Sequence, residues 1–386
     1  MNDIIYLDNA ATTQPYPEVI ELMMDIQANE FGNSSSMHRK GVAAGRIIKE
    51  STETIAGILG CAPDEIVFTS GGAESNNMAI KGCALKKRRS GNVIVTTAFE
   101  HPTVLNTVKN LTDFNINGAI CGIDNSGGIR ESELLGLINP SVILVSAMTV
   151  NSETGAYTDM GVLSEKIKSI NEGTIVHTDA VQAFCKLPLN LKSWNHVDML
   201  SISSHKVHGP KGVGALFIRK GTPVSPLIDG GGPHAGIRAG TENTAGIAGF
   251  ALASLLFSKN LSKNHIHASE LKSYLIGILK RRIDSFVINS PGNSSPYILS
   301  VAFSGIKSEV LLNHLSGKEI YVSAGSACSS KKKSNSHVLE AMHVPDEFIS
   351  GALRISLSPQ NTKSEIDIMA DELCSIIPFL RKTVKK

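Results

Sequence analysis

A lysine with polar neighbours follows an apolar segment in the middle of the chain. Residues 197–203 (VDMLSIS) are typical of a buried strand, and Lys206 comes three residues after its end, followed by VHGPKG. An amine at the end of a strand, in the ligand crevice of a sheet, can form a Schiff base with an aldehyde. Ser203 and His205 beside it are suited to bind a phosphate group. A surface lysine is the alternative interpretation when Lys206 is considered alone.

An acidic residue ends another apolar segment. Residues 175–180 (IVHTDA) place Asp179 at the end of a predicted strand, and Gln182 follows three residues later. Pyridoxal phosphate needs such a partner, because a carboxylate at its ring nitrogen keeps the ring protonated and able to accept electrons. Gln182 is suited to donate to the cofactor's phenolic oxygen. A helix N-cap is the alternative role of Asp179.

A glycine-rich turn lies between a predicted strand and a predicted helix. Residues 70–77 (SGGAESNN) include Gly72 and Ala73, whose small size lets backbone N–H groups approach an anion at the helix N-terminus. The spacing matches neither the dinucleotide fingerprint nor the Walker pattern. Further along, His101 follows another strand, where its ring could stack on a pyridine. A structural histidine is the alternative.

One of the six cysteines has surroundings that favour reactivity. Cys328 lies in SAGSACSSKKK (residues 323–333), where small polar residues and three lysines favour an exposed segment and the thiolate form. An incidental loop thiol is the alternative. The other cysteines have apolar or helical surroundings and are predicted to be packing residues. They show no paired zinc-type spacing.

An arginine interrupts an otherwise apolar strand near the C-terminus. Residues 351–356 (GALRIS) contain Arg354, which requires an anion there. A substrate carboxylate held by two parallel hydrogen bonds is one candidate. A buried internal salt bridge is the other.

Together these segments resemble the cysteine desulfurases of the NifS/IscS-like group, within the class V aminotransferase family. The match runs from YLDNAATT at residues 6–13 to about Leu357, and its most specific parts are SSHKVHGPKG around Lys206 and GSAC around Cys328. The resemblance implies a pyridoxal-phosphate fold-type I homodimer with active sites at the subunit interface.

The resemblance also assigns roles by position. The catalytic residues would be Cys328, Lys206 and His101. The cofactor would be bound by Lys206, Gly72, Ala73, His101, Ser152, Asp179, Gln182, Ser203, His205 and, from the other subunit, Thr241. Asn33 and Arg354 would hold the substrate carboxylate. Three positions depart from the family pattern: Ala73 replaces a threonine, Ser152 an asparagine, and Ser204 a glycine or alanine.

The implied reaction converts L-cysteine to L-alanine and leaves the sulfur on Cys328 as a persulfide. A sulfur-acceptor protein would then receive it for iron–sulfur cluster assembly or thiolation. A transient iron–sulfur cluster on Cys328 is a further alternative, and no resident metal is expected. Two alternative functions stay open: a selenocysteine lyase or other pyridoxal-phosphate enzyme, and a degenerate non-catalytic scaffold.

Composition supports a soluble enzyme. The 386 residues carry a net charge of +2, with 42% apolar and 19% charged residues, so neither nucleic acid nor a membrane surface is expected as a partner. No apolar run reaches the roughly 18 residues of a membrane span. The first residues also lack a secretory signal pattern, so a cytoplasmic location is expected.

The elements that must position these residues form an α/β pattern. Apolar strands alternate with helices through the first two thirds of the chain, which indicates a mostly parallel sheet, of the seven-stranded type that the resemblance implies, covered on both faces. Strands are predicted at 65–69, 93–97, 142–147, 175–178, 197–203, 298–303, 320–323 and 353–357. Helices are predicted at 38–59, 241–259, 266–286, 309–315 and 364–380. We expect a large cofactor domain at 16–258, and a smaller α+β domain, carrying the cysteine loop, from 1–15 and 259–386.

Overall fold

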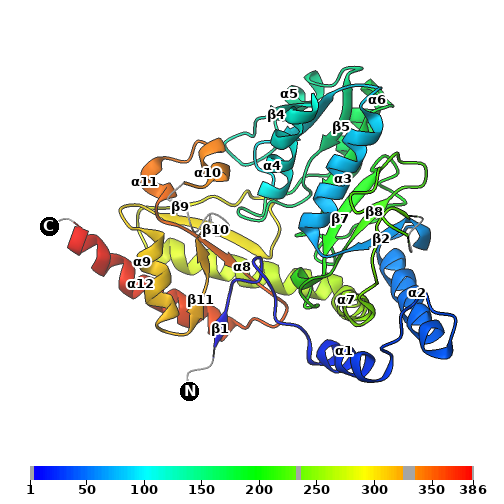
Figure 1. The fold of residues 1–386 in the computed structure, drawn as a ribbon. Coiled ribbons are helices and arrows are strands. Elements are labelled where there is room, and N and C mark those ends of the chain that lie inside the picture. The colour runs from blue at the N-terminus through cyan, green and yellow to red at the C-terminus, as the bar shows by residue number, and fades with distance from the viewer. Residues whose placement is uncertain (1–3, 232–235, 325–334, 385–386) are drawn as a thin grey trace.

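The structure is a computed structural model that describes residues 4–231, 236–324 and 335–384. Cys328 and the rest of its loop therefore lie outside the described residues. Figure 1 shows a larger body around a twisted sheet and a smaller body in which α8, α9 and α12 lie beside a second sheet. The N-terminal strand β1 lies in the smaller body, beside β11.

The larger body is built on a seven-stranded sheet with the order β2-β8-β7-β6-β5-β3-β4. Only β8 runs antiparallel to its neighbours, so the sheet is mostly parallel, as predicted. Its strands are β2 (Ile66–Thr69), β3 (Val93–Thr97), β4 (Asn117–Cys121), β5 (Val142–Ser146), β6 (Ile175–Asp179), β7 (Met199–Ser203) and β8 (Gly214–Ile218).

Helices cover both faces of this sheet because successive strand residues point to opposite sides. Ile94, for example, belongs to the apolar cluster under α3 and α4, whereas Val95 belongs to the cluster shared with α2, α6 and α7. This two-sided burial explains why these strands are continuously apolar in sequence. The helices are α1 (Pro17–Asn29), α2 (Arg39–Leu59), α3 (Gly72–Lys87), α4 (Pro102–Asn110), α5 (Glu131–Gly136), α6 (Met160–Ile170) and α7 (Thr244–Ser258).

The smaller body has a four-stranded antiparallel sheet with the order β12-β13-β10-β9 and its own apolar core. Its strands are β9 (Phe286–Ile288), β10 (Ile298–Phe303), β12 (Ser323–Ala324) and β13 (Ala352–Ser356). A separate parallel pair joins β1 (Ile5–Tyr6) to β11 (Ile320–Tyr321). The helices of the smaller body are α8 (Leu261–Arg282), α9 (Ser308–Ser316), α10 (His337–Ala341), α11 (Asp346–Ile349) and α12 (Lys363–Val384).

Most of the predicted elements are present. The helix predicted at 38–59 is α2, which His38 caps at its start and Gly60 ends with a φ of 74°. Two predictions are wrong in detail. The strand predicted at 320–323 is divided between two sheets, and residue 286, placed at the end of a helix, begins β9. The sequence analysis also missed β4 and β8. The proposed domain boundaries remain a prediction.

No single helix in the described ranges is both long and apolar enough to cross a membrane. Helices α7 and α8 meet that criterion only as a pair, bent by 70° where they join.

Candidate active site

Ten of the predicted site residues meet in one cavity at the carboxyl ends of β6 and β7. Its volume is about 330 Å³. The predicted residues that line it are Gly72, Ala73, His101, Ser152, Asp179, Gln182, Ser203, His205, Lys206 and Arg354. Ligands of open parallel sheets bind at this edge, because the loops that follow the strands leave a crevice there. The cavity therefore gathers residues that are far apart in sequence.

Lys206 ends a short 3₁₀ turn directly after β7. Its Nζ donates hydrogen bonds to the backbone oxygens of Ala10 (2.7 Å) and Ala11 (2.6 Å), which also line the cavity. The N-terminal segment thus fixes the lysine within the cavity. Lys206 therefore lines the cavity and can approach a ligand bound there.

Asp179 is the last residue of β6, and it is buried. Its Oδ2 accepts a hydrogen bond from Asn76 Nδ2 (2.7 Å), and its Oδ1 accepts one from the backbone N–H of Val181 (3.0 Å). Asn76 lies on α3, so the helix that begins at the glycine-rich turn also orients the carboxylate. These two donors hold the carboxyl group in place. The carboxylate therefore remains available to pair with a cation in the cavity.

His101 caps the start of α4 and lines the same cavity. Its Nδ1 accepts from the backbone N–H of Thr103 (3.2 Å), so the neutral ring carries its proton on Nε2. Burial lowers the pKa of His101, and the nearby Lys206 lowers it further, although Asp179 opposes both effects. The capping contact fixes the ring, and burial favours its neutral form. A fixed, neutral ring is suited to stacking on an aromatic ligand.

The cavity contains groups that fit a phosphate. The Ser203 side-chain oxygen is buried and has no hydrogen-bond partner within the described chain. The N-terminus of α3, with its free backbone N–H groups, begins at Gly72, where a Cβ atom would come within 2.8 Å of Val181 Cγ2. An unpartnered hydroxyl and a helix N-terminus in one cavity are what a phosphorylated ligand requires. The residues present therefore fit pyridoxal phosphate.

Two of the three departures from the family pattern bear on the cavity itself. Ala73 lines it and offers no hydroxyl there, and Ser152 lines it as well. Ser204 is buried behind the cavity, where its Oγ faces Gly209 so closely that a Cβ on that glycine would come within 2.1 Å. Ser204 therefore does not replace the hydroxyl that Ala73 lacks.

Arg354 lies on β13 and enters the cavity from the smaller body. Its Nη2 forms an ion pair with Asp8 Oδ1 (2.8 Å), and its Nη1 donates to the Ser152 backbone oxygen (3.0 Å). The internal salt bridge considered as an alternative is therefore present. Among the described residues, Arg354 Nε is buried without a partner, so the guanidinium still has donating capacity. Both roles of Arg354 are compatible with the structure.

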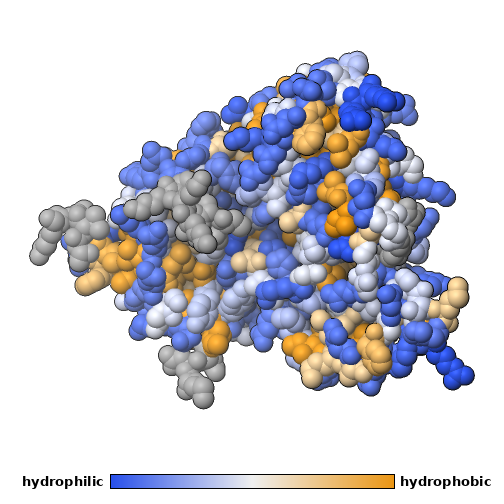
Figure 2. All heavy atoms as spheres, in the orientation of Figure 1, coloured by the Kyte–Doolittle hydropathy of each residue, from blue (hydrophilic) through white to orange (hydrophobic). Residues whose placement is uncertain are grey.

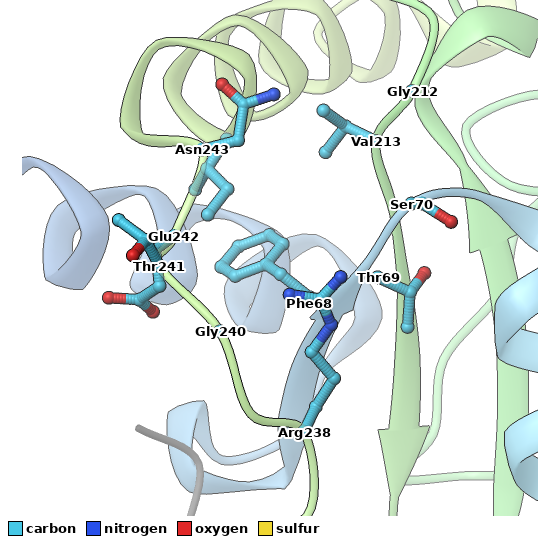
Figure 3. A pocket seen from close by; sticks show the side chains of 11 residues that line it. Phe68, Thr69, Ser70, Gly212, Val213, Arg238, Gly240, Thr241, Glu242 and Asn243 are labelled. Atoms are coloured by element: carbon cyan, nitrogen blue, oxygen red, sulfur yellow. The ribbon is translucent and has the colours of Figure 1, made fainter. Parts of the chain in front are cut away.

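Two predicted residues lie away from this cavity within the chain. Thr241 and Asn33 line a neighbouring pocket, and Thr241 also lines a second one beside β2. Figure 3 shows Thr241 and Glu242 on the segment between Arg238 and Asn243. Arg238 Nε pairs with Glu74 Oε1 on α3 at 3.0 Å, which ties this segment to the glycine-rich turn. The roles of Thr241 and Asn33 stay predictions.

The five described cysteines lie in packed surroundings. Burial raises the pKa of Cys61 and Cys83 to about 12 and that of Cys121 to about 11. Burial also raises the pKa of Cys185 and Cys374. None of the five lines the cavity described above. In the described part of the chain, the thiols are therefore held in their unreactive neutral form.

The sequence analysis missed three polar groups that shape the cavity: Asn76, Asp8 and Thr103. Asn76 lies within the glycine-rich segment, one turn into α3, and this position on the helix could have suggested its role. Asp8 gave no signal, because its contact with Arg354 joins residues 346 positions apart. In the described ranges, no group of three or more His, Cys, Asp or Glu side chains is arranged to hold a metal ion.

Comparisons with known proteins cover almost the whole chain. A family model described as Aminotransferase class-V matches residues 5–369. The chain is 40% identical to "Cysteine desulfurase IscS" of Dictyoglomus turgidum (strain DSM 6724 / Z-1310), over 98% of this chain and 95% of that protein. A solved structure of a "NifS-like protein" shares 37% identity and a TM-score of 0.92, over 98% of this chain and 100% of its own. Another, "SspA in complex with cysteine", shares 33% identity and a TM-score of 0.82, over 93% and 100%.

Proposed function

The chain belongs to the class-V aminotransferase family, and from that premise we propose how it acts on its substrate. It is a pyridoxal-phosphate-dependent cysteine desulfurase of fold-type I, which converts L-cysteine to L-alanine. The observation that supports the mechanism is that Lys206, Asp179, His101 and Arg354 line the same cavity. That cavity does not favour the scaffold alternative, because the fixed Asp179 carboxylate and the Ser203 hydroxyl, which has no partner among the described residues, suit a cofactor.

The cavity residues have distinct roles toward the cofactor. Lys206 would hold it covalently, His101 would stack on its ring, and Asp179 would pair with its ring nitrogen. Ser203, His205 and the start of α3 would bind its phosphate. When bound, pyridoxal phosphate supplies an electron sink for negative charge that develops on the substrate carbon.

Arg354 and Lys206 act on the substrate itself. Arg354 binds the carboxylate of cysteine, which orients the Cα–H bond within the cavity. Lys206 Nζ then takes the Cα proton as general base. In the cofactor-free chain, hydrogen bonds from Nζ to the Ala10 and Ala11 oxygens hold this side chain within the cavity. Asn33 is also proposed as a carboxylate contact, although within the chain it lines a separate pocket.

Cys328 is proposed as the sulfur acceptor. Its thiolate attacks the substrate sulfur, and a new S–S bond forms as the carbon–sulfur bond breaks. The electron pair of that bond stays with carbon, which is protonated to give alanine, and Cys328 is left as a persulfide. The neutral thiols of the five described cysteines support this assignment, because the thiolate is the nucleophilic form.

A homodimer is proposed on the basis of an apolar surface on α1. Ile20 and Met24 are exposed there and border a groove with Pro210. Figure 2 shows apolar residues gathered over α1 at the lower edge of the molecule. Thr241 would reach the partner's cavity in such a dimer. A Met24→Asp protein that sediments as a dimer like the unmodified chain would contradict this interface.

The persulfide sulfur is proposed to pass to an acceptor protein for iron–sulfur cluster assembly or thiolation. A cytoplasmic location suits this role, since all five described cysteines are unpaired thiols, as a reducing compartment maintains them. Mass spectrometry of protein isolated after reaction with cysteine would locate the extra sulfur. Its presence on any residue other than Cys328 would exclude the proposed acceptor.

The decisive assay supplies purified protein with L-cysteine and a reductant and measures alanine and sulfide together. We expect equal amounts of both products from the unmodified protein. Cys328→Ser should lose sulfide release, whereas the matched control Cys61→Ser should keep it, because Cys61 lies outside the cavity. A Cys328→Ser protein that releases both products at the original rate would remove Cys328 from the mechanism. Replacing cysteine by selenocysteine in the same assay tests the lyase alternative.

A further inference from the structure

A second lysine is buried behind the cavity and has no role in the mechanism above. Lys186 lies one turn after Gln182, in the segment that follows β6, and is only 3% exposed. Its Nζ donates to Gln182 Oε1 at 3.2 Å and lies 6.0 Å from the centre of the Tyr297 ring. A buried ammonium group costs free energy unless it is paired, so its presence requires an explanation.

Contacts from Lys186 lead to the reactive lysine through one amide. Gln182 Oε1 accepts from Lys186, and Gln182 Nε2 donates to the Ala10 oxygen at 2.8 Å. The same oxygen accepts from Lys206 Nζ at 2.7 Å. The amide oxygen of Gln182 accepts from a donor and its nitrogen donates to an acceptor, so the orientation of the amide is fixed. Gln182 lines the cavity, and the second N–H of its Nε2 can donate to a ligand there.

The charged and titratable groups around Lys186 give it no anion. Burial lowers the pKa of Lys186 to about 7, and the cations Lys206 and Arg354 lower it further. Cys185 acts in the opposite direction, but burial raises its own pKa and keeps it a neutral thiol. Tyr297 is likewise kept neutral, since burial raises its pKa. In the described part of the chain, Lys186 forms no ion pair, so an anionic group bound in the nearby cavity would favour its protonated form.

We propose that Lys186 is a positioning residue for the cofactor site: it fixes the Gln182 amide with an N–H directed to the cavity, and its charge favours an anionic oxygen bound there. This inference rests on the proposed function and names a further determinant of the same site. Binding of an anionic ligand should in turn favour the protonated form of Lys186, because the coupling between two sites is reciprocal.

The test is a pH titration of the visible absorption of the holoenzyme without cysteine. Removing a nearby cation and the donor that fixes Gln182 should make the group bound at Lys206 more basic. Lys186→Met should therefore raise the midpoint of this absorption titration by on the order of one pH unit. Lys192→Met, which removes an exposed lysine from the next turn of chain, should leave the midpoint unchanged. A structural role alone would change the unfolding temperature and leave the midpoint where it is.

A double variant tests whether Lys186 acts through Gln182. The midpoint of Gln182→Ala/Lys186→Met should exceed that of Gln182→Ala by much less than the shift from Lys186→Met alone. Fully additive shifts, or a coloured Lys186→Met enzyme with an unchanged midpoint, would overturn the proposal. If Lys186→Met does not fold, Lys186→Gln keeps a donor without the charge and should still raise the midpoint. An unmodified protein that never acquires a visible band would instead refute the proposed function, and this inference with it.

Discussion

The two walls of the cavity are held in different ways. On the wall formed by the seven-stranded sheet, Asp179 and His101 are fixed by partners from the same body, Asn76 and Thr103. On the opposite wall, Arg354 depends on Asp8 and on the Ser152 oxygen, which lie 346 and 202 positions away in sequence. The cofactor wall is therefore organised mainly within the larger body, although the Ala10 and Ala11 oxygens also hold Lys206 there. The carboxylate wall exists only when the two bodies and the N-terminal segment meet. Changes on the first wall should affect the cofactor, and changes on the second should affect substrate binding.

The largest effect is expected from Lys206→Ala, which removes the amine from the cofactor wall. Loss of the general base should lower kcat by at least about 10³-fold. The covalent link to the cofactor should also disappear, which borohydride reduction followed by mass spectrometry would show. The matched control is Lys220→Ala, because Lys220 is exposed and lies just after the end of β8. A reducible link that persists in Lys206→Ala would place the attachment at another amine.

Asp179→Asn should have the next largest effect, on the same wall. The neutral amide cannot stabilise a protonated ring nitrogen, so kcat should fall by about 10²–10³-fold. The KM for cysteine should change little, because Asp179 does not face the carboxylate. Steady-state kinetics on cofactor-saturated protein separates the two constants. A variant in which only KM rises would contradict the division between the walls.

Arg354→Lys tests the opposite wall. Lysine cannot make two parallel hydrogen bonds to a carboxylate, and losing one bond to a charged group costs about 1.5–3 kcal/mol. The KM for cysteine should therefore rise by roughly 10–100-fold, while the cofactor absorption spectrum stays unchanged. Arg130→Lys, an exposed arginine far from the cavity, is the control. A changed spectrum with an unchanged KM would mean that Arg354 serves the cofactor wall instead.

The smallest effect concerns the interior of the seven-stranded sheet. Burial lowers the pKa of His177 to about 3, and both ring nitrogens contact serine hydroxyls. The unfolded chain binds this proton below its ordinary pKa of about 6.5, whereas the folded chain resists it, so stability is lost as pH falls from about 6.5 toward 3. Between pH 7 and 5.5, urea unfolding should show His177→Gln losing about 1 kcal/mol less than the unmodified apoprotein. An equal loss in both proteins would show that His177 is protonated in the fold.

Local patterns were sufficient to predict the elements that are buried on both sides. Strands β3 and β10 have the predicted limits, because a short, continuous apolar segment flanked by polar residues is typical of a buried strand. β4 was missed because its residues are largely exposed and give no apolar signal. The segment 320–323 was predicted as one strand, yet β11 pairs with β1 and β12 with β13. The segment divides because its two halves pair with different strands that are distant in sequence, and local composition does not indicate such pairings.

The sequence by itself identified the groups that line the cavity: an amine, a carboxylate, a glycine-rich turn and an arginine, each placed at the end of or within an apolar strand. Motif spacing carries that information because parallel strands bring their carboxyl ends to one edge. Only the tertiary structure decided which other residues hold these groups in position. Asp8 reaches Arg354, and Lys186 reaches Gln182 and through it the Ala10 oxygen, because hydrogen bonds depend on distance in space and not on distance along the chain.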